Sequence, residues 1–132
     1  MKSRATIALA VAALAAAGCG GSSSGGSKQQ VKSAFNTLMS DLSSHNPAAC
    51  TMFTTRYAVE NTGQGSYSAA LAVCRRHIQS GTVSVPKGLK ISKIKVKGHT
   101  ATVKAIAPGQ GSGIFHFFKE GGHWKVDGVT AK

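Results

Sequence analysis

The stretch KISKIKVKGHTATVKAIA, residues 90–107, decides the fold class. Its first half alternates, with Ile94 and Val96 on one side and lysines on the other. Its second half alternates as well, with a small or branched apolar residue at every second position from residue 101. Only Gly98-His99 separates the two runs, and so short a link joins antiparallel strands. The stretch therefore predicts a hairpin with one apolar face and one lysine face.

Downstream, the pattern predicts a third strand over 114–119 and a fourth over 123–129, joined at Glu120-Gly121-Gly122. We expect residues 108–113 to form a loop. A short extra strand over 82–85 is a further expectation. These runs together make an antiparallel sheet of about four strands.

Upstream, the period of the apolar residues is helical. A stripe that begins at Val31 and Phe35 predicts an amphipathic helix over 28–43. Asn46-Pro47 is typical of the start of a short second helix over 48–53, and Ser66 of the start of a third. Helices followed by a meander of strands indicate an α+β fold, with the helices packed on one face of the sheet.

Composition limits the chemistry. The chain has 132 residues, of which 42% are hydrophobic, so it is long enough for one folded domain. Sixteen Lys and Arg residues against four acids give a net charge of +12, which favours anionic surroundings. Few carboxylates remain for acid–base catalysis or for a metal site, and we expect neither a metal nor a cofactor. The acids are Asp41, Glu60, Glu120 and Asp127.

The N-terminus is typical of a secretory signal. Lys2 and Arg4 precede an apolar run over 5–17, which is too short for a permanent membrane span. The run ends in Ala17-Gly18-Cys19, which resembles a bacterial lipobox, where the cysteine is diacylated and becomes the first residue after cleavage. The alternative is an ordinary secreted protein with a cysteine at this place by chance.

The lipobox interpretation divides the chain into three parts. Residues 1–18 are the signal peptide, residues 19–27 the lipidated Cys19 with a Gly/Ser tether, and residues 28–132 a single α+β domain. Two acyl chains anchor a protein stably, so we expect it on the extracytoplasmic face of the cell membrane. Outside the cytoplasm, the remaining pair, Cys50 and Cys74, is expected to form a disulfide. A reduced, metal-binding or nucleophilic pair is the alternative.

Three features carry a resemblance to a known family. They are the amphipathic helix followed by Asn46-Pro47-Ala48-Ala49-Cys50, the Cys50–Cys74 spacing, and the two hairpin patterns over 94–103 and 117–127. Together they resemble the small extracytoplasmic lipoproteins of the nuclear-transport-factor-2-like superfamily. The resemblance implies a cystatin-like or nuclear-transport-factor-2-like cone, in which a curved sheet wraps a long helix and leaves a pocket between them. It also implies that two copies of the domain can pair through their sheets as a homodimer.

The family's catalytic pattern is not found in this sequence. Its ketosteroid-isomerase-like enzymes place a carboxylate base inside the cone, and no acid here falls at a clear inward strand position. We therefore expect no enzymatic activity. A small pocket enzyme of the ketosteroid-isomerase or polyketide-cyclase type is the alternative. It would be favoured by a buried acid or by His116 facing a cavity.

Small residues on the second strand leave room for a small apolar ligand, although helix side chains could equally fill that space. His116 alternates with Phe115 and Phe117, so a one-residue change of register decides whether it faces a pocket or solvent. The candidate pocket residues are Leu38, Met39, Ala101, Ala105, His116 and Trp124.

A cluster of basic residues is the remaining candidate site. Its functional interpretation is an electrostatic adaptor for anionic lipid or wall polymer, and the alternative is a solvated face that protects an edge strand. Nucleic acid is not expected, because the protein is predicted outside the cell and the lysine strand has no aromatic residues for base stacking. The cluster comprises Arg75, Arg76, Lys87, Lys90, Lys93, Lys95, Lys97 and Lys104.

The sequence thus predicts a membrane-anchored extracytoplasmic lipoprotein. Its domain is expected to bind a ligand or a partner at the cell envelope without catalysing a reaction.

Overall fold

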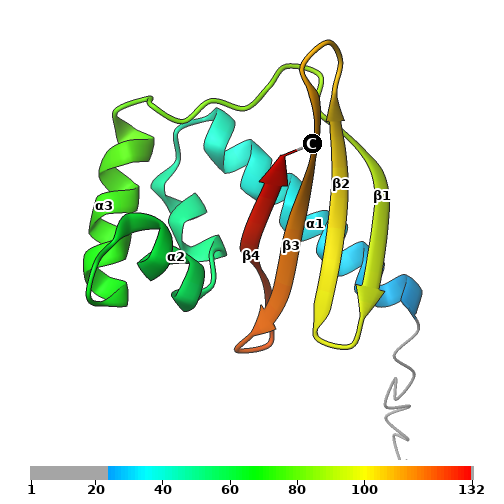
Figure 1. Ribbon diagram of the computed structural model, residues 1–132, viewed down its shortest axis with the longest axis horizontal. Helices are drawn as coiled ribbons and strands as arrows, with labels where there is room; N and C mark the ends of the chain where they lie inside the picture. The colour runs from blue at the N-terminus through cyan, green and yellow to red at the C-terminus, as the bar shows by residue number, and fades with distance from the viewer. Residues whose placement is uncertain (1–23, 132) are drawn as a thin grey trace, which may run out of the picture.

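The computed structural model describes residues 24–131. The predicted signal peptide, the lipidation site Cys19 and the tether up to residue 23 lie outside this range. The strands form one four-stranded sheet. Figure 1 shows the long N-terminal helix behind this sheet and the shorter helices to one side. The helices precede the strands in the chain, so the α+β prediction is confirmed.

Helix α1 (Ser24–Ser43) follows the predicted apolar stripe. Val31, Phe35 and Leu38 are almost fully buried against the sheet. The helix begins four residues before the predicted Lys28 and so includes residues 24–27 of the predicted tether. Ser and Gly are poor helix formers but do not forbid a helix, and a helix already nucleated by its buried stripe extends at small cost.

Hydrogen bonds of the Asn46 side chain fix the connection that follows α1. The Asn46 side chain accepts a hydrogen bond from the backbone N–H of Ala48 at 3.0 Å and donates one to Asp41 at 3.2 Å. This cap begins η1 (Pro47–Met52), which is a 3-10 helix. The helix ends at Met52 because Phe53 is extended and forms a bridge with Val126 of the sheet.

Helix α2 (Thr55–Thr62) is an element that the sequence did not reveal. Thr54 caps it by accepting a hydrogen bond from the N–H of Tyr57 at 3.2 Å, and Gly63 ends it in a left-handed conformation. Of its eight residues only Ala58 is buried, so it has no apolar stripe. Glu60, one of the four acids, lies in this helix.

Helix α3 (Tyr67–Gln79) begins at the predicted cap Ser66, whose hydroxyl accepts a hydrogen bond from the N–H of Ala69 at 3.3 Å. The predicted disulfide between Cys50 and Cys74 is confirmed. It joins η1 to α3, with the two Cα atoms 5.9 Å apart. The short helices are therefore held together covalently beside the sheet.

The sheet is an antiparallel meander in the order β1-β2-β3-β4, and β1 (Lys90–Lys97) and β2 (Thr100–Ala107) have the predicted bounds. The other strands, β3 (Gly111–Glu120) and β4 (His123–Ala131), are longer than predicted. In β3 the glycine-rich residues from 111 pair with the end of β2, which shortens the expected loop. The expected strand over 82–85 does not form, and these residues lie in an irregular connection before β1.

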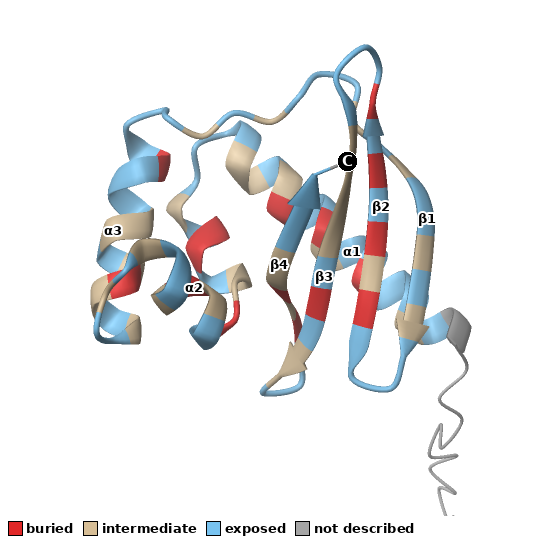
Figure 2. Ribbon diagram, in the orientation of Figure 1, coloured by how far each residue is buried: buried red, intermediate tan, exposed pale blue. Residues whose placement is uncertain are grey.

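The two faces of the sheet differ in what covers them. On β2 the residues Ala101, Val103, Ala105 and Ala107 are buried, whereas the alternate positions face away from the helices. Figure 2 shows this alternation along β2, with α1 behind the sheet and no helix in front of it. The outward face of the sheet is therefore not covered by any helix of residues 24–131.

No helix within residues 24–131 combines the length and the apolar character that a bilayer crossing requires.

Candidate functional site

An apolar cavity of about 440 Å³ lies between α1, α2, α3 and the paired residues Phe115 of β3 and Val129 of β4. Its size falls within the usual range for small-molecule sites. Most of its lining is aliphatic or aromatic, and no carboxylate contributes to it. The lining residues are Leu38, Leu42, Phe53, Tyr57, Ala58, Asn61, Thr62, Val73, Cys74, His77, Ile78, Val83, Phe115 and Val129.

Many of the residues that line this cavity also belong to the hydrophobic core or to the disulfide. Leu38 comes from the buried stripe of α1, and Phe115 stacks edge-on against Phe35 with ring centroids 5.0 Å apart. Cys74 belongs to the disulfide, which holds α3 at the cavity. The cavity is thus preformed by tertiary packing, as ligand sites usually are.

Three polar side chains line the cavity without partners in the described part of the chain. The Tyr57 hydroxyl, the Asn61 amide and the His77 imidazole make no hydrogen bond to residues 24–131. An amphipathic ligand therefore finds unused donors and acceptors there. Sequence reasoning missed all three, although His77 lies three residues after Cys74 and so shares its side of α3.

The described part of the chain also contains two other hollows. One, of about 320 Å³, lies under the connection before β1 and shares Leu42, Phe115 and Val129 with the apolar cavity. The other is a wider groove of about 730 Å³ between α1, η1 and the β3–β4 turn, lined largely by polar and basic residues. We take the 440 Å³ cavity as the candidate site because it is larger than the hollow beside it and its lining is more apolar than that of the wider groove.

The predicted pocket residues do not surround one cavity. Leu38 lines the candidate cavity, Met39 and Ala105 line the hollow beside it, and Trp124 lines the wider groove. Ala101 is packed in the core. The inward orientation of Ala101 and Ala105 on β2 was predicted correctly. The helix side chains that fill the space beside them depend on how α1 crosses the sheet, which the sequence pattern does not specify.

His116 lies on the uncovered face of the sheet and contacts Thr130, with 3.1 Å between its Nε2 and the threonine Oγ1. The register explains this, because Phe115 and Phe117 pair with the inward residues Val103 and Ala101. His116 therefore does not face the candidate cavity.

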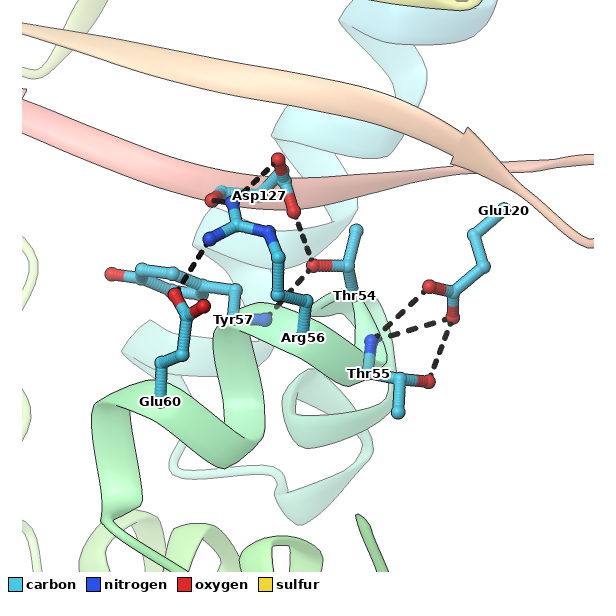
Figure 3. A network of polar contacts seen from close by, with 7 residues as sticks. All are labelled: Thr54, Thr55, Arg56, Tyr57, Glu60, Glu120 and Asp127. Carbon is cyan, nitrogen blue, oxygen red and sulfur yellow. Dashed lines mark hydrogen bonds and ion pairs between the residues drawn. The ribbon is translucent and has the colours of Figure 1, made fainter.

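The carboxylates are engaged in contacts that hold α2 to the sheet (Figure 3). Arg56 binds Glu60 at 2.6 Å on its own helix and Asp127 of β4 at 2.7 Å. The Thr54 hydroxyl donates a hydrogen bond to Asp127 at 2.6 Å. Glu120 accepts a hydrogen bond from the N–H of Thr55 at 3.2 Å.

This network shifts the ionisation of its members. Partial burial acts to raise the pKa of the Asp127 carboxyl, but the hydrogen bonds from Arg56 and Thr54, together with the Arg56 charge, outweigh it and lower the pKa below its usual value. The hydrogen bond and charge of Asp127 in turn raise the pKa of Arg56. Asp127 is thus held as a carboxylate for a structural purpose.

The remaining acid, Asp41, binds Asn46 at the end of α1. None of the four carboxylates therefore lines the candidate cavity. Nor does any group of three or more metal-ligating side chains form within residues 24–131. The cavity offers apolar contact and hydrogen bonds, and its one imidazole lacks an orienting partner.

The basic residues are divided between two parts of the molecule. The β1 lysines and Lys104 point outward from the uncovered sheet face. Arg75 and Arg76 lie on α3, in the helical part, and Lys87 lies in the connection before β1. The predicted cluster therefore separates into a sheet group and outlying residues, because α3 packs beside the sheet and away from β1.

Comparison with solved structures establishes the class of fold: it is the nuclear-transport-factor-2-like α+β fold. A crystal structure described as an NTF-2 like protein of unknown function from Silicibacter pomeroyi aligns with a TM-score of 0.53. The alignment covers 83% of this chain and 98% of that chain, at 14% sequence identity. No protein-family profile and no curated protein matches the chain.

Proposed function

We propose that this chain is a membrane-anchored extracytoplasmic lipoprotein whose domain binds a small, largely apolar ligand without converting it. The observation that carries the proposal is the 440 Å³ cavity, which has an apolar lining and no carboxylate. The nuclear-transport-factor-2-like fold is compatible with this role but does not by itself assign it, since one fold serves many functions.

The chemistry of the lining indicates the ligand class. Apolar walls favour a hydrocarbon or aromatic body, whose transfer from water supplies most of the affinity. Tyr57, Asn61 and His77 can orient one polar group of that ligand. An uncharged or weakly polar amphipathic molecule suits this lining better than a strongly anionic one, which would need a cation inside the cavity.

A binding role is favoured over a catalytic one by the placement of the ionisable groups. General acid–base catalysis needs a titratable group within hydrogen-bond reach of the reacting atom. The carboxylates serve the contacts of Figure 3 and the end of α1, outside the cavity. His77 is exposed and makes no hydrogen bond in the described chain that would select its tautomer.

The cellular location is supported by two independent features. The lipobox-like ending at Cys19 is the first. The second is the Cys50–Cys74 disulfide, a linkage that persists mainly outside the reducing cytoplasm. Both features fit a domain held at the outer surface of the cell membrane.

Ligand occupancy is tested by native mass spectrometry of the exported full-length protein, compared with the same sample after denaturation. We expect an adduct that is released on denaturation and whose mass identifies a chemical class. Titration of the emptied protein with the uncharged apolar fluorophore N-phenyl-1-naphthylamine should then give saturable binding near one per chain.

A matched pair of variants assigns this binding to the cavity. Val73→Trp fills the cavity, and we expect it to weaken fluorophore binding at least tenfold. Ala72→Trp is the control, because Ala72 is the exposed neighbour on the same helix and does not line the cavity. A bare native mass without saturable binding would contradict the binding role, and time-dependent conversion of the released ligand would contradict the non-catalytic one.

A further inference from the structure

The uncovered face of the sheet carries a dense group of lysines, which we call the lysine face. Register places Lys90 opposite Ile106, Lys95 opposite Thr102 and Lys97 opposite Thr100, all pointing away from the helices. Lys93 stands directly opposite Lys104. The lysine face comprises the side chains of Lys90, Lys93, Lys95, Lys97 and Lys104.

This arrangement opposes the stability of the sheet. Like charges directly opposite one another on neighbouring strands repel, and Lys93 and Lys104 form such a pair. Among the ion pairs of residues 24–131, none involves a member of the lysine face. The positive charge is therefore left without a protein counter-charge, which is the condition under which an anionic partner gains most.

Apolar side chains lie on the same face. Ile106 is 42% exposed and Phe118, on the neighbouring strand, is 41% exposed. Phe118 pairs with Thr100 and so points to the same side as Lys97. Exposed apolar groups beside lysines match the interface of a bilayer, where apolar groups enter the acyl boundary and lysines meet the phosphates. A purely polar wall polymer would contact only the lysines and would leave Ile106 and Phe118 without an apolar partner.

The proposed anchor holds this face close to a bilayer. Only Cys19 to residue 23, a stretch of five residues, separates the lipidation site from the start of α1. Fully extended, such a stretch reaches roughly 17 Å. Figure 1 shows α1 beginning near the end of β1, and the two elements are in contact. The β1 edge thus cannot move far from the leaflet.

We propose that the lysine face docks on a leaflet rich in anionic lipid headgroups, an inference that rests on the proposed membrane anchor. A second copy of the chain is a poorer occupant, because face-to-face pairing would oppose lysines with lysines. The docked state places the centre of the sheet at the headgroups and leaves the helical part, with the apolar cavity, away from the membrane.

The test uses the acylated full-length protein on vesicles of neutral phosphatidylcholine or of phosphatidylcholine with 30% phosphatidylglycerol. An environment-sensitive fluorophore is attached at Thr102→Cys, in the centre of the lysine face, or at Ala72→Cys on α3 as the control. We expect the label at 102 to report a less polar environment on anionic vesicles only, with reversal in about 0.5 M salt, where the Debye length is short. The label at 72 should not respond.

A charge-matched pair of variants ties the signal to this face. Each lysine near an anionic leaflet contributes about fivefold to partitioning, so Lys93→Glu with Lys95→Glu should lower the docked-to-undocked ratio at least 25-fold. Arg75→Glu with Arg76→Glu changes the net charge equally on α3 and should have little effect.

Three outcomes would overturn the docking proposal. They are an equal response on neutral and anionic vesicles, a response to a soluble anionic polymer but not to vesicles, and a response that follows protein density and accompanies cross-linking between copies. Failure of the anchor is seen separately, as loss of protein from neutral vesicles. In that event the same labels, on unacylated protein added to anionic vesicles, still test the face.

Discussion

Thr54 joins local and long-range structure through one hydroxyl. That oxygen accepts the hydrogen bond that begins α2 and donates the one that reaches Asp127 on β4. Thr54 is only 2% exposed, so water cannot readily take the place of either hydrogen-bond partner. Loss of one partner would therefore lower the stability of the fold. Through Thr54, the position of α2, and with it one wall of the cavity, depends on the end of the sheet.

We expect Thr54→Val to lower the free energy of unfolding by about 1–2 kcal/mol, because it removes both the helix cap and a hydrogen bond to a charged group. Thr54→Ser keeps the hydroxyl and should stay within about 0.5 kcal/mol of the wild type. Urea unfolding followed by circular dichroism measures both. A loss in Thr54→Ser as large as that in Thr54→Val would contradict this account, because Thr54→Ser keeps the hydroxyl and removes only the methyl group.

Asp127 should make stability depend on acid. Its pKa is lower in the folded protein than the ordinary value of 3.8, so its stabilising contribution is complete above that value and is lost as the pH falls through the folded pKa. We expect the free energy of unfolding of the wild type to decline from about pH 5 towards pH 2, and Asp127→Asn to show a shallower decline. Arg56→Gln removes the cation and should flatten the profile similarly. An unchanged acid slope in Asp127→Asn would contradict this account.

At the scale of elements, the disulfide is the main restraint on the short helices. It joins η1 and α3 across a sequence separation of 24 residues. Both helices are short, with 6 and 13 residues. Without it, α3 would be held to η1 by side-chain packing alone, whereas the end of η1 would keep the bridge between Phe53 and Val126. The covalent link therefore bears on both the stability of the domain and the shape of the cavity.

Replacement of Cys50 and Cys74 by Ala should lower the free energy of unfolding by about 3 kcal/mol, the value that the chain-entropy model gives for a loop of this length. We also expect weaker binding of N-phenyl-1-naphthylamine at the cavity, since Cys74 lines it. Chemical unfolding of the oxidised wild type and the double variant provides the comparison. Two free thiols in native exported protein would show that the link does not form in the cell.

At the scale of the whole molecule, the proposed location at the membrane depends on Cys19. Cys19→Ser removes the thiol that would carry the acyl chains, so we expect loss of the acyl mass from the protein. Intact-mass spectrometry of the membrane fraction measures this directly. A variant that keeps an acyl mass in that fraction would rule out lipidation at this residue.

The strands were predictable because their signal is local, and the cysteine pair was predictable by elimination. Residues 90–107 carry a two-residue period and a glycine turn, and β1 and β2 have the predicted bounds. Cys50 and Cys74 were the only pair left once Cys19 was assigned to lipid. The Gly-rich start of β3 was not predictable, since glycines favour loops unless a neighbouring strand supplies their hydrogen bonds.

The sequence by itself determined the α+β class, the hairpin bounds and which residues alternate along each strand. Only the tertiary structure decided which side of β3 is covered, and so placed His116 outside and Phe115 inside. It also brought Arg56 to Asp127, 71 positions apart in the chain, and closed the cavity from three helices and two strands. The physical reason is that periodicity is encoded between near neighbours, whereas a cavity depends on long-range packing of segments whose relative positions no local pattern specifies.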